Sequence, residues 1–287
     1  MRSFQLHDIG SMAFIQPAVH EPAAAAVTAQ TDSLATVCAV AILAMMISDV
    51  VHEGIGHGLT ALLTVSPSGV LSTVAWNSAY NSKLVDAGGT IANLIAAAIL
   101  WLLLRSARRA SPATRLFLLL TCAFDLFAGT GYFLFSGVSN FGDWADVIQG
   151  LRPHGLWRVL LVVGGALAFW VALVIAGSAL IRSVGIPRSE RRRIGRLMLV
   201  AYLSAVAIAC IGGALNPEGI QYVFRSSLPA TAGAGSGLLY MQYYARRNIR
   251  PATNVEPINR SYAWIGVTAA CVLPYILVLG RGITLTR

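Results

Sequence analysis

Long apolar segments dominate this chain and restrict the folds that it can adopt. Seven of them approach or exceed the roughly 20 residues that a helix needs to cross a bilayer. They cover approximately residues 34–60, 84–104, 115–137, 157–181, 197–214, 227–245 and 262–280. Only 11% of the residues are charged, whereas a soluble domain carries roughly a quarter. The pattern predicts an all-α polytopic membrane protein with about seven transmembrane helices.

The basic residues lie between the apolar segments and predict the topology. Arginine-rich connections (105–115, 182–196, 246–260) alternate with connections poor in basic residues (64–83, 138–156, 215–226). Under the positive-inside rule the arginine-rich set is cytoplasmic. We therefore expect a multi-pass protein of a bacterial-type cell membrane, with its amino terminus in the cytoplasm. The net charge of +9 then reflects orientation in the bilayer, and no nucleic-acid partner is expected.

The sequence predicts one transmembrane domain, residues 34–287, preceded by an N-terminal arm, residues 1–33. It shows no internal repeat and no low-complexity linker. The loop after the first apolar segment differs from the other connections. Its residues 70–76 are rich in β-forming residues and follow Pro67 and Gly69. A proline and a glycine before a run of β-forming residues are typical of a short strand or hairpin. A short β-hairpin at the membrane surface and an irregular loop are both compatible with it.

Ionisable residues interrupt the first apolar segment, in the run Val50-Val51-His52-Glu53-Gly54-Ile55-Gly56-His57-Gly58. Such groups are costly in hydrocarbon, so their presence there indicates a functional site. The run approaches His-Glu-x-x-His, in which two histidines bind zinc and the glutamate acts as general base. Here one additional residue separates the histidines.

The additional residue changes the geometry that the motif requires. Residues five apart in an α-helix point about 140° from one another, too far to share an ion. A π-bulge absorbs one residue and returns both side chains to one face. Gly54 and Gly56 lie in the gap, and glycine tolerates irregular backbone. The spacing therefore predicts a π-bulge between His52 and His57, if the two bind one ion.

The run resembles the motif of the site-2 protease family of intramembrane zinc metalloproteases. Residues 88–93, Gly-Gly-Thr-Ile-Ala-Asn, resemble the family's Ala-Gly-Pro-x-x-Asn, with Thr90 in place of proline. The resemblance implies that His52 and His57 bind Zn²⁺, that Glu53 activates water, and that Asn93 binds substrate. The family's Asn-x-x-Pro-x-x-x-Leu-Asp-Gly, whose aspartate completes its metal site, is missing here.

Two aspartates compete to be the third zinc ligand. Asp125 lies within the third apolar segment and Asp143 just beyond it. The predicted topology puts the histidines near the outer end of the first helix, which favours Asp143. Asp49, one turn before Glu53, is a candidate to orient a histidine. His154, in the same connection as Asp143, is a weaker candidate ligand.

The sequence thus predicts a zinc-dependent intramembrane endopeptidase that hydrolyses peptide bonds of membrane-protein substrates. Two alternatives stay open at this point. A metal-dependent membrane lipid hydrolase would use the same water activation. A non-catalytic protease-like protein or a transporter would need no metal, and the histidine spacing is the feature that favours it.

Overall fold

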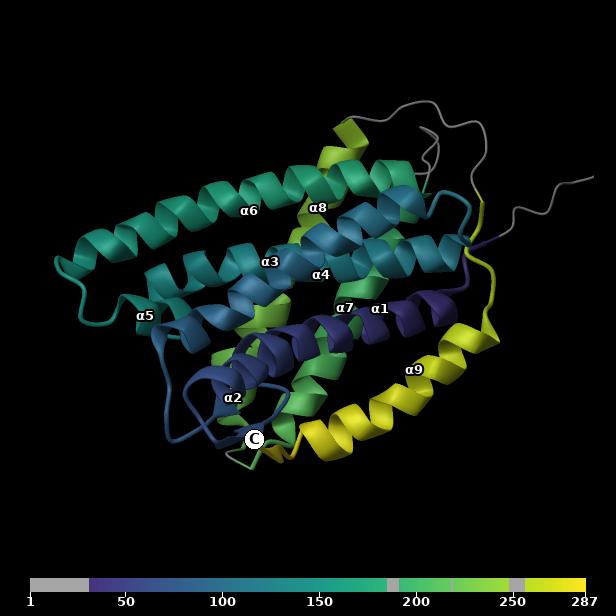
Figure 1. The fold of residues 1–287 in the computed structure, drawn as a ribbon. Coiled ribbons are helices and arrows are strands. Elements are labelled where there is room, and N and C mark those ends of the chain that lie inside the picture. Colours follow the sequence, from purple (N-terminus) through teal and green to yellow (C-terminus); the bar gives the residue numbers. More distant parts are fainter. Residues whose placement is uncertain (1–30, 185–190, 218, 248–255) are drawn as a thin grey trace, which may run out of the picture. The chain divides into compact units, whose positions relative to one another are not determined.

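The computed structural model describes residues 31–184, 191–217, 219–247 and 256–287, so most of the predicted N-terminal arm lies outside the described residues. Helices form most of the described chain (Figure 1). The long helices and their extensions are α1 (Leu34–Asp49), η1 (Val50–Leu59), α2 (Thr60–Thr64), α3 (Lys83–Ser106), α4 (Pro112–Ser139), α6 (His154–Val184), α7 (Arg191–Ala214), α8 (Gly237–Arg247), α9 (Tyr262–Pro274) and η5 (Tyr275–Leu279). The short helix α5 (Asp143–Ile148) precedes α6. The predicted all-α polytopic class is confirmed.

Six helices in the described part are long and apolar enough to span a membrane: Leu34–Thr64, Lys83–Ser106, Pro112–Ser139, His154–Ser183, Arg192–Ala214 and Tyr262–Leu279. The predicted number was about seven. The remaining apolar segment, 227–245, is also helical but irregular. It divides into a π-helix η3 (Val223–Gly233), a 3₁₀ turn η4 (Ala234–Ser236) and α8, with Pro229 inside η3. Proline removes a backbone donor and interrupts a regular helix, which explains why this segment does not form one long span.

Serine residues define where several of these helices begin. The side chains of Ser33, Ser82 and Ser111 each accept a hydrogen bond from the backbone N–H three residues later, at the starts of α1, α3 and α4. Such caps satisfy donors that the first turn of a helix leaves unpaired. Pro112 follows Ser111 as the first residue of α4, where proline is well tolerated.

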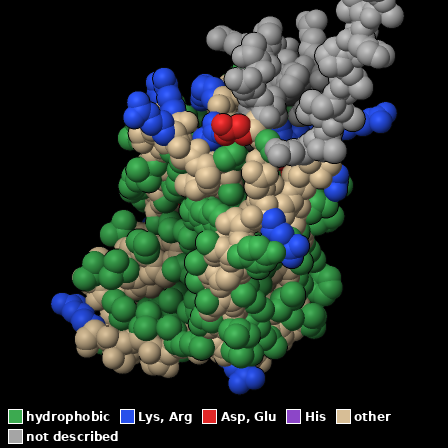
Figure 2. All heavy atoms as spheres, turned by 90° about the vertical axis from the view of Figure 1, so that its right-hand side faces the viewer, with side chains coloured by type: hydrophobic (Ala, Val, Ile, Leu, Met, Phe, Trp, Pro, Cys, Tyr) green, Lys and Arg blue, Asp and Glu red, His purple; other side chains and the backbone are tan. Residues whose placement is uncertain are grey.

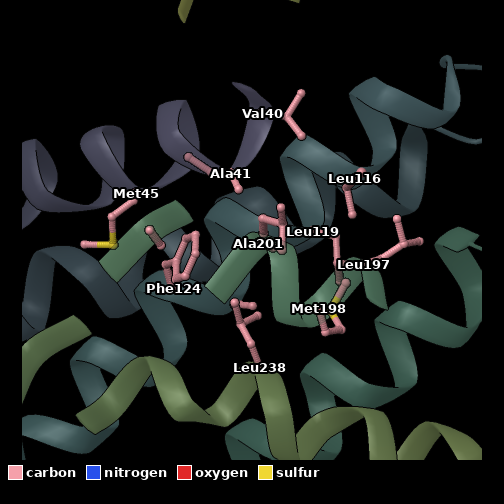
Figure 3. Close-up of a cluster of buried hydrophobic side chains, with 14 of the residues drawn as sticks. Val40, Ala41, Met45, Leu116, Leu119, Phe124, Leu197, Met198, Ala201 and Leu238 are labelled. Atoms are coloured by element: carbon pink, nitrogen blue, oxygen red, sulfur yellow. The ribbon is translucent and has the colours of Figure 1, made fainter. Parts of the chain in front are cut away.

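The apolar core lies between α1, α4, α7 and α8, whose side chains point toward one another in Figure 3. Val40, Leu120 and Met198 are completely buried there, each at 0% exposure. α4 also packs along α3 and α6. Gly165 of α6 lies against α4 so closely that an added Cβ would stand 2.5 Å from the backbone nitrogen of Leu134. Small residues permit such close approach between membrane helices.

The described parts of the three arginine-rich connections lie at one end of the bundle, next to the start of α1. Arg193 binds Asp32 with an N–O distance of 2.6 Å, and Arg115 binds Glu256 at 3.1 Å. The backbone N–H of Ser33 donates to the carbonyl of Ile258 at 2.7 Å. Figure 2, which faces this end, shows Lys and Arg mainly at its upper margin and hydrophobic side chains over much of the rest. The basic connections therefore share one end, as the sequence predicted; their cytoplasmic location stays a prediction.

A small antiparallel sheet lies at the opposite end, beyond α2. The predicted hairpin is present as β1 (Ser68–Leu71) and β2 (Trp76–Asn77), with Leu71 opposite Trp76. A strand that the sequence did not predict, β3 (Ile283–Thr286), pairs with the other edge of β1. The strand order is β2-β1-β3, so β2 is an edge strand. In Figure 1 the carboxyl terminus accordingly lies beside α2.

Candidate metal centre

The continuous helix that starts with α1 changes to a π-helix at the histidine motif. η1 covers ten residues, Val50–Leu59, so the predicted bulge is present and is longer than a single extra residue. Hydrogen bonds between residues five apart define a π-helix, and they stack His52 above His57. The two Nε2 atoms lie 3.3 Å apart.

Glycines on two helices allow η1 and α3 to touch. A Cβ added to Gly56 would stand 2.4 Å from the Cα of Gly89, and one added to Gly88 would stand 2.0 Å from the carbonyl oxygen of Gly56. A Cβ at Gly89 would lie 2.5 Å from Nε2 of both His52 and His57. Any side chain at these positions would separate the helices or fill the space in front of the imidazoles.

Asp143 completes a compact group with the two histidines. Its Oδ2 lies 3.2 Å from Nε2 of His52 and 3.3 Å from Nε2 of His57. The three atoms therefore form a nearly equilateral triangle. In a tetrahedral zinc site with bonds of about 2.0–2.1 Å, neighbouring ligand atoms lie about 3.3–3.4 Å apart. The triangle has the dimensions of one face of such a tetrahedron, and among the described residues it is the group able to hold a metal ion.

The loop after α4 explains how Asp143 reaches this position. α4 ends at Ser139, its C-cap Asn140 adopts the left-handed conformation, and Gly142 has φ of +84°. Glycine adopts that conformation without a steric penalty. The chain thus turns back, and Asp143 becomes the first residue of α5. The indole N–H of Trp144 donates to the hydroxyl of Thr90 at 2.8 Å, which ties α5 to α3.

Hydrogen bonds at Nδ1 fix the tautomer of both histidines. Nδ1 of His52 lies 2.5 Å from Oδ1 of Asn93, and Nδ1 of His57 lies 2.7 Å from the carbonyl oxygen of Val85. Both oxygens can only accept, so both Nδ1 atoms carry the proton. Each neutral ring then directs the lone pair of Nε2 toward Asp143, the arrangement found in histidines that bind metals.

The centre of the triangle therefore needs a positive charge. Oδ2 of Asp143 is buried and receives no hydrogen bond, so three lone pairs converge on one point. Burial alone would raise the pKa of Asp143, but positive charge on the imidazoles of His57 and His52 would lower it below its ordinary value. A proton on an imidazole or a metal cation can supply the charge, and the residues present fit the cation.

Asp125, the competing candidate for third ligand, lies behind His52 instead of beside it. Its Oδ1 accepts hydrogen bonds from the hydroxyl of Ser48 at 2.6 Å and from the amide of Asn93 at 2.7 Å. Asn93 in turn accepts from His52. Asp125, Asn93 and His52 thus form a chain of hydrogen bonds from a fully buried carboxylate through an amide to the imidazole. This chain orients the imidazole ring. Asp143, and not Asp125, thus lies beside the two Nε2 atoms; its role as a metal ligand stays a prediction.

The amide of Asn93 is thus engaged on both sides, since its nitrogen also donates to the carbonyl of Ser48 at 3.3 Å. Its predicted role in binding substrate stays a prediction. Asp49 accepts a hydrogen bond from the hydroxyl of Tyr275 at 3.0 Å, and not from a histidine as predicted. His154 lies apart from the group, with Nε2 2.9 Å from Oδ1 of Asn140.

Glu53, His57 and Asp143 face a cavity of about 280 Å³, whereas His52 and Glu53 line a second, smaller cavity. The walls of the larger cavity come from η1, β2, α3, α4, α5 and η3, and include Glu53, His57, Asp143, Trp76 and Tyr132. Tyr132 stacks on His52 with ring centroids 4.7 Å apart. Neither this contact nor the carbonyl of Val85 was found from the sequence, because a tyrosine in an apolar helix and a backbone oxygen carry no motif. The pKa of Asp146, also on the cavity wall, is raised by burial and by the charge of Asp143.

Comparison of the chain with protein-family models, with curated proteins and with solved structures finds no match.

Proposed function

We propose that this protein is a zinc-dependent intramembrane endopeptidase. The observation that carries the proposal is the triangle of two imidazole nitrogens and one carboxylate oxygen, with sides of 3.2–3.3 Å. Three protein ligands and one open position are typical of catalytic zinc, whereas structural zinc sites have four protein ligands. The resemblance of the motif to that of site-2 proteases supports the same assignment.

The donor set suits zinc better than harder cations. Two imidazole nitrogens are suitable ligands for Zn²⁺, whereas Mg²⁺ and Ca²⁺ prefer oxygen ligands. Zinc bound by His52, His57 and Asp143 would act as a Lewis acid on the scissile carbonyl and lower the pKa of attacking water to about 7. The chain of hydrogen bonds through Asn93 and the carbonyl of Val85 would hold both rings in place.

Glu53 is the proposed general base. It follows His52 directly in η1, is 6% exposed, and lines the same cavity as His57 and Asp143. A carboxylate so placed would accept a proton from the attacking water and transfer it to the leaving amine. Burial of Glu53 strengthens its electrostatic interaction with the water and with the leaving amine, because the surroundings have a low dielectric constant.

The hairpin supports a peptide as the substrate. Residues Val74, Ala75, Trp76 and Asn77 form one wall of the cavity, and β2 is an edge strand of its sheet. An extended peptide can add to an edge strand through backbone hydrogen bonds, whatever its sequence. Membrane-protein segments that unwind beside β2 are therefore the proposed substrates.

Metal content tests the first half of the proposal. Protein purified in detergent with zinc present should contain about one zinc per chain, and His57→Ala should contain almost none. His154→Ala is the matched control, because that histidine lies outside the group, and should keep its zinc. A wild type without zinc, or equal zinc in both variants, would favour the non-catalytic alternative.

Trapping of the substrate tests the second half. Glu53→Gln should retain zinc, lose about 10²–10⁴-fold in activity, and accumulate uncut membrane proteins in the cells that express it. Glu256→Gln, at the opposite end of the bundle, is the control. Accumulation of an intact lipid in the Glu53→Gln cells, with all membrane proteins processed normally, would identify a lipid hydrolase instead.

A further inference from the structure

Four arginines line one cavity of about 460 Å³ at the basic end of the bundle, far along the helices from the histidines. The complete lining is Trp101, Leu104, Arg105, Arg108, Arg115, Ala179, Arg182 and Ser183. Arg105 belongs to the last turn of α3 and Arg182 to the last turn of α6, while Arg115 lies at the start of α4. Three helices and one connection thus direct guanidinium groups to the same space.

Most of this positive charge is not neutralised by the described part of the chain. Arg115 pairs with Glu256 at 3.1 Å. No described acid lies within ion-pair distance of Arg105, Arg108 or Arg182. In addition, Nε of Arg115 is buried without a hydrogen-bond partner. Like charges that share a cavity repel one another, so an anion in that space would relieve the repulsion and satisfy the unpaired donor.

The guanidinium of Arg105 is held in position by an aromatic ring. It lies over the indole of Trp101, 4.5 Å from the ring centroid. Stacking of this kind leaves the N–H edge of an arginine available for hydrogen bonds. Guanidinium groups form paired hydrogen bonds with carboxylate and with phosphate oxygens. A phosphate group has more oxygens than a carboxylate, so it can accept hydrogen bonds from more of the four arginines. A tetrahedral anion with several oxygens is therefore the best match to four arginines.

Apolar side chains next to the cavity face outward. On α3, Ile99, Leu102 and Leu103 are 53%, 61% and 48% exposed. They lie within one turn of Trp101, so acyl chains could lie along them while a headgroup occupies the cavity. Basic pockets between transmembrane helices bind anionic headgroups in this way.

We propose that this cavity binds a phosphate group, supplied by an anionic lipid headgroup or by a soluble phosphate. The positive-inside rule explains why arginines occur at this end, but it does not require that they converge. Arg109, the neighbour of Arg108, does not line the cavity. This difference between adjacent residues supplies a control.

Binding to the full-length protein in detergent tests the proposal, with short-chain phosphatidylglycerol, the matching phosphatidylcholine and inorganic phosphate as probes. The wild type should bind phosphatidylglycerol more tightly than phosphatidylcholine. Each arginine near an anionic lipid contributes about 1 kcal/mol, so Arg108→Gln with Arg182→Gln should weaken phosphatidylglycerol binding about 30-fold. Arg109→Gln with Arg260→Gln removes the same charge at the same end and should leave it nearly unchanged.

The outcomes separate the two sources of phosphate and the rival explanation. Tight binding of inorganic phosphate that the cavity variant loses would assign the site to a soluble phosphate. Binding of phosphatidylglycerol alone would assign it to a lipid. Equal losses in both double variants would show that only the total charge matters, and would overturn the proposal. A wild-type protein that binds all three probes equally would also overturn the proposal. Arg108→Lys with Arg182→Lys, which keeps the charge, guards against a folding defect in the glutamine variant.

Discussion

The two halves of the first long helix are built in opposite ways. α1 is a regular and mainly apolar helix whose residues Val37, Val40 and Ala41 are fully buried in the core. η1 continues it as a π-helix with three glycines, two histidines and a glutamate. Packing of apolar side chains explains α1, whereas η1 depends on close backbone contact with α3 and on polar contacts with Val85 and Asn93. Within this first helix, irregular geometry is thus confined to the part that carries the candidate metal ligands.

The contrast predicts that backbone contact matters most in η1. Gly56→Ala should destabilise the protein by about 3 kcal/mol or more, because the new methyl would meet backbone atoms of α3 that cannot move aside easily. It should also abolish zinc binding. Thermal unfolding and metal analysis would measure both effects.

Gly54→Ala is the matched control for this substitution. A Cβ there would lie 3.6 Å from its nearest neighbour, an ordinary contact, so the variant should be as stable as the wild type or slightly more so. If both variants behaved alike, the proposed role of close packing would be wrong.

The polar contacts of η1 are expected to have a smaller effect, mainly on metal binding. Asn93→Ala removes the acceptor that orients His52 and should weaken zinc binding about 30-fold, within the range known for such supporting residues. Competition with a chelator would measure the affinity. Asn259→Ala, an exposed asparagine at the opposite end, should have no effect, and a loss of affinity there would indicate a general change in folding.

The apolar half should show the reverse pattern. Val40→Ala removes two buried methyl groups from α1 and should cost about 1.5 kcal/mol of stability, while zinc content stays at about one per chain. Val50→Ala, at a position 39% exposed, should cost less. Loss of zinc in Val40→Ala would mean that metal binding by η1 depends on the apolar packing of α1.

The smallest effect concerns the start of α1, where Asp32 binds Arg193. Burial alone would raise the pKa of Asp32, but the guanidinium of Arg193 and the N–H of Ile258 lower it. The ion pair therefore stabilises the fold above the ordinary aspartate pKa of about 3.9 and is lost as pH falls below it. Asp32→Asn should lower stability by about 1 kcal/mol at pH 7, with the curves of the two proteins converging in acid. A constant difference at all pH values would contradict this.

Sequence reasoning was most successful where a local pattern decides the structure. Apolar length predicted the long helices, arginine spacing predicted the shared basic end, and Pro67 with Gly69 indicated the hairpin. The histidine spacing predicted the π geometry between His52 and His57. Each of these rests on residues close together in the chain.

Features that depend on distant residues could not be found in this way. β3 carries no signal that it pairs with β1, and the chain of hydrogen bonds from Asp125 through Asn93 joins three helices. The irregular helix from η3 to α8 was predicted as an ordinary span, although Pro229 lies within it. The preference for Asp143 over Asp125 needed an assumption about depth in the bilayer, since nothing local distinguishes two aspartates.

The position of Asp143 on a short helix far along the chain has a mechanical consequence. An ion shared by His52, His57 and Asp143 would cross-link residues 57 and 143. It would close the chain between them into a loop, as a disulfide bond does. Such closure stabilises a fold by restricting the unfolded chain. Chelation should then lower the unfolding temperature and expose the segment from Asn140 to Pro153 to proteases, so that loss of the ion loosens the wall of its own cavity.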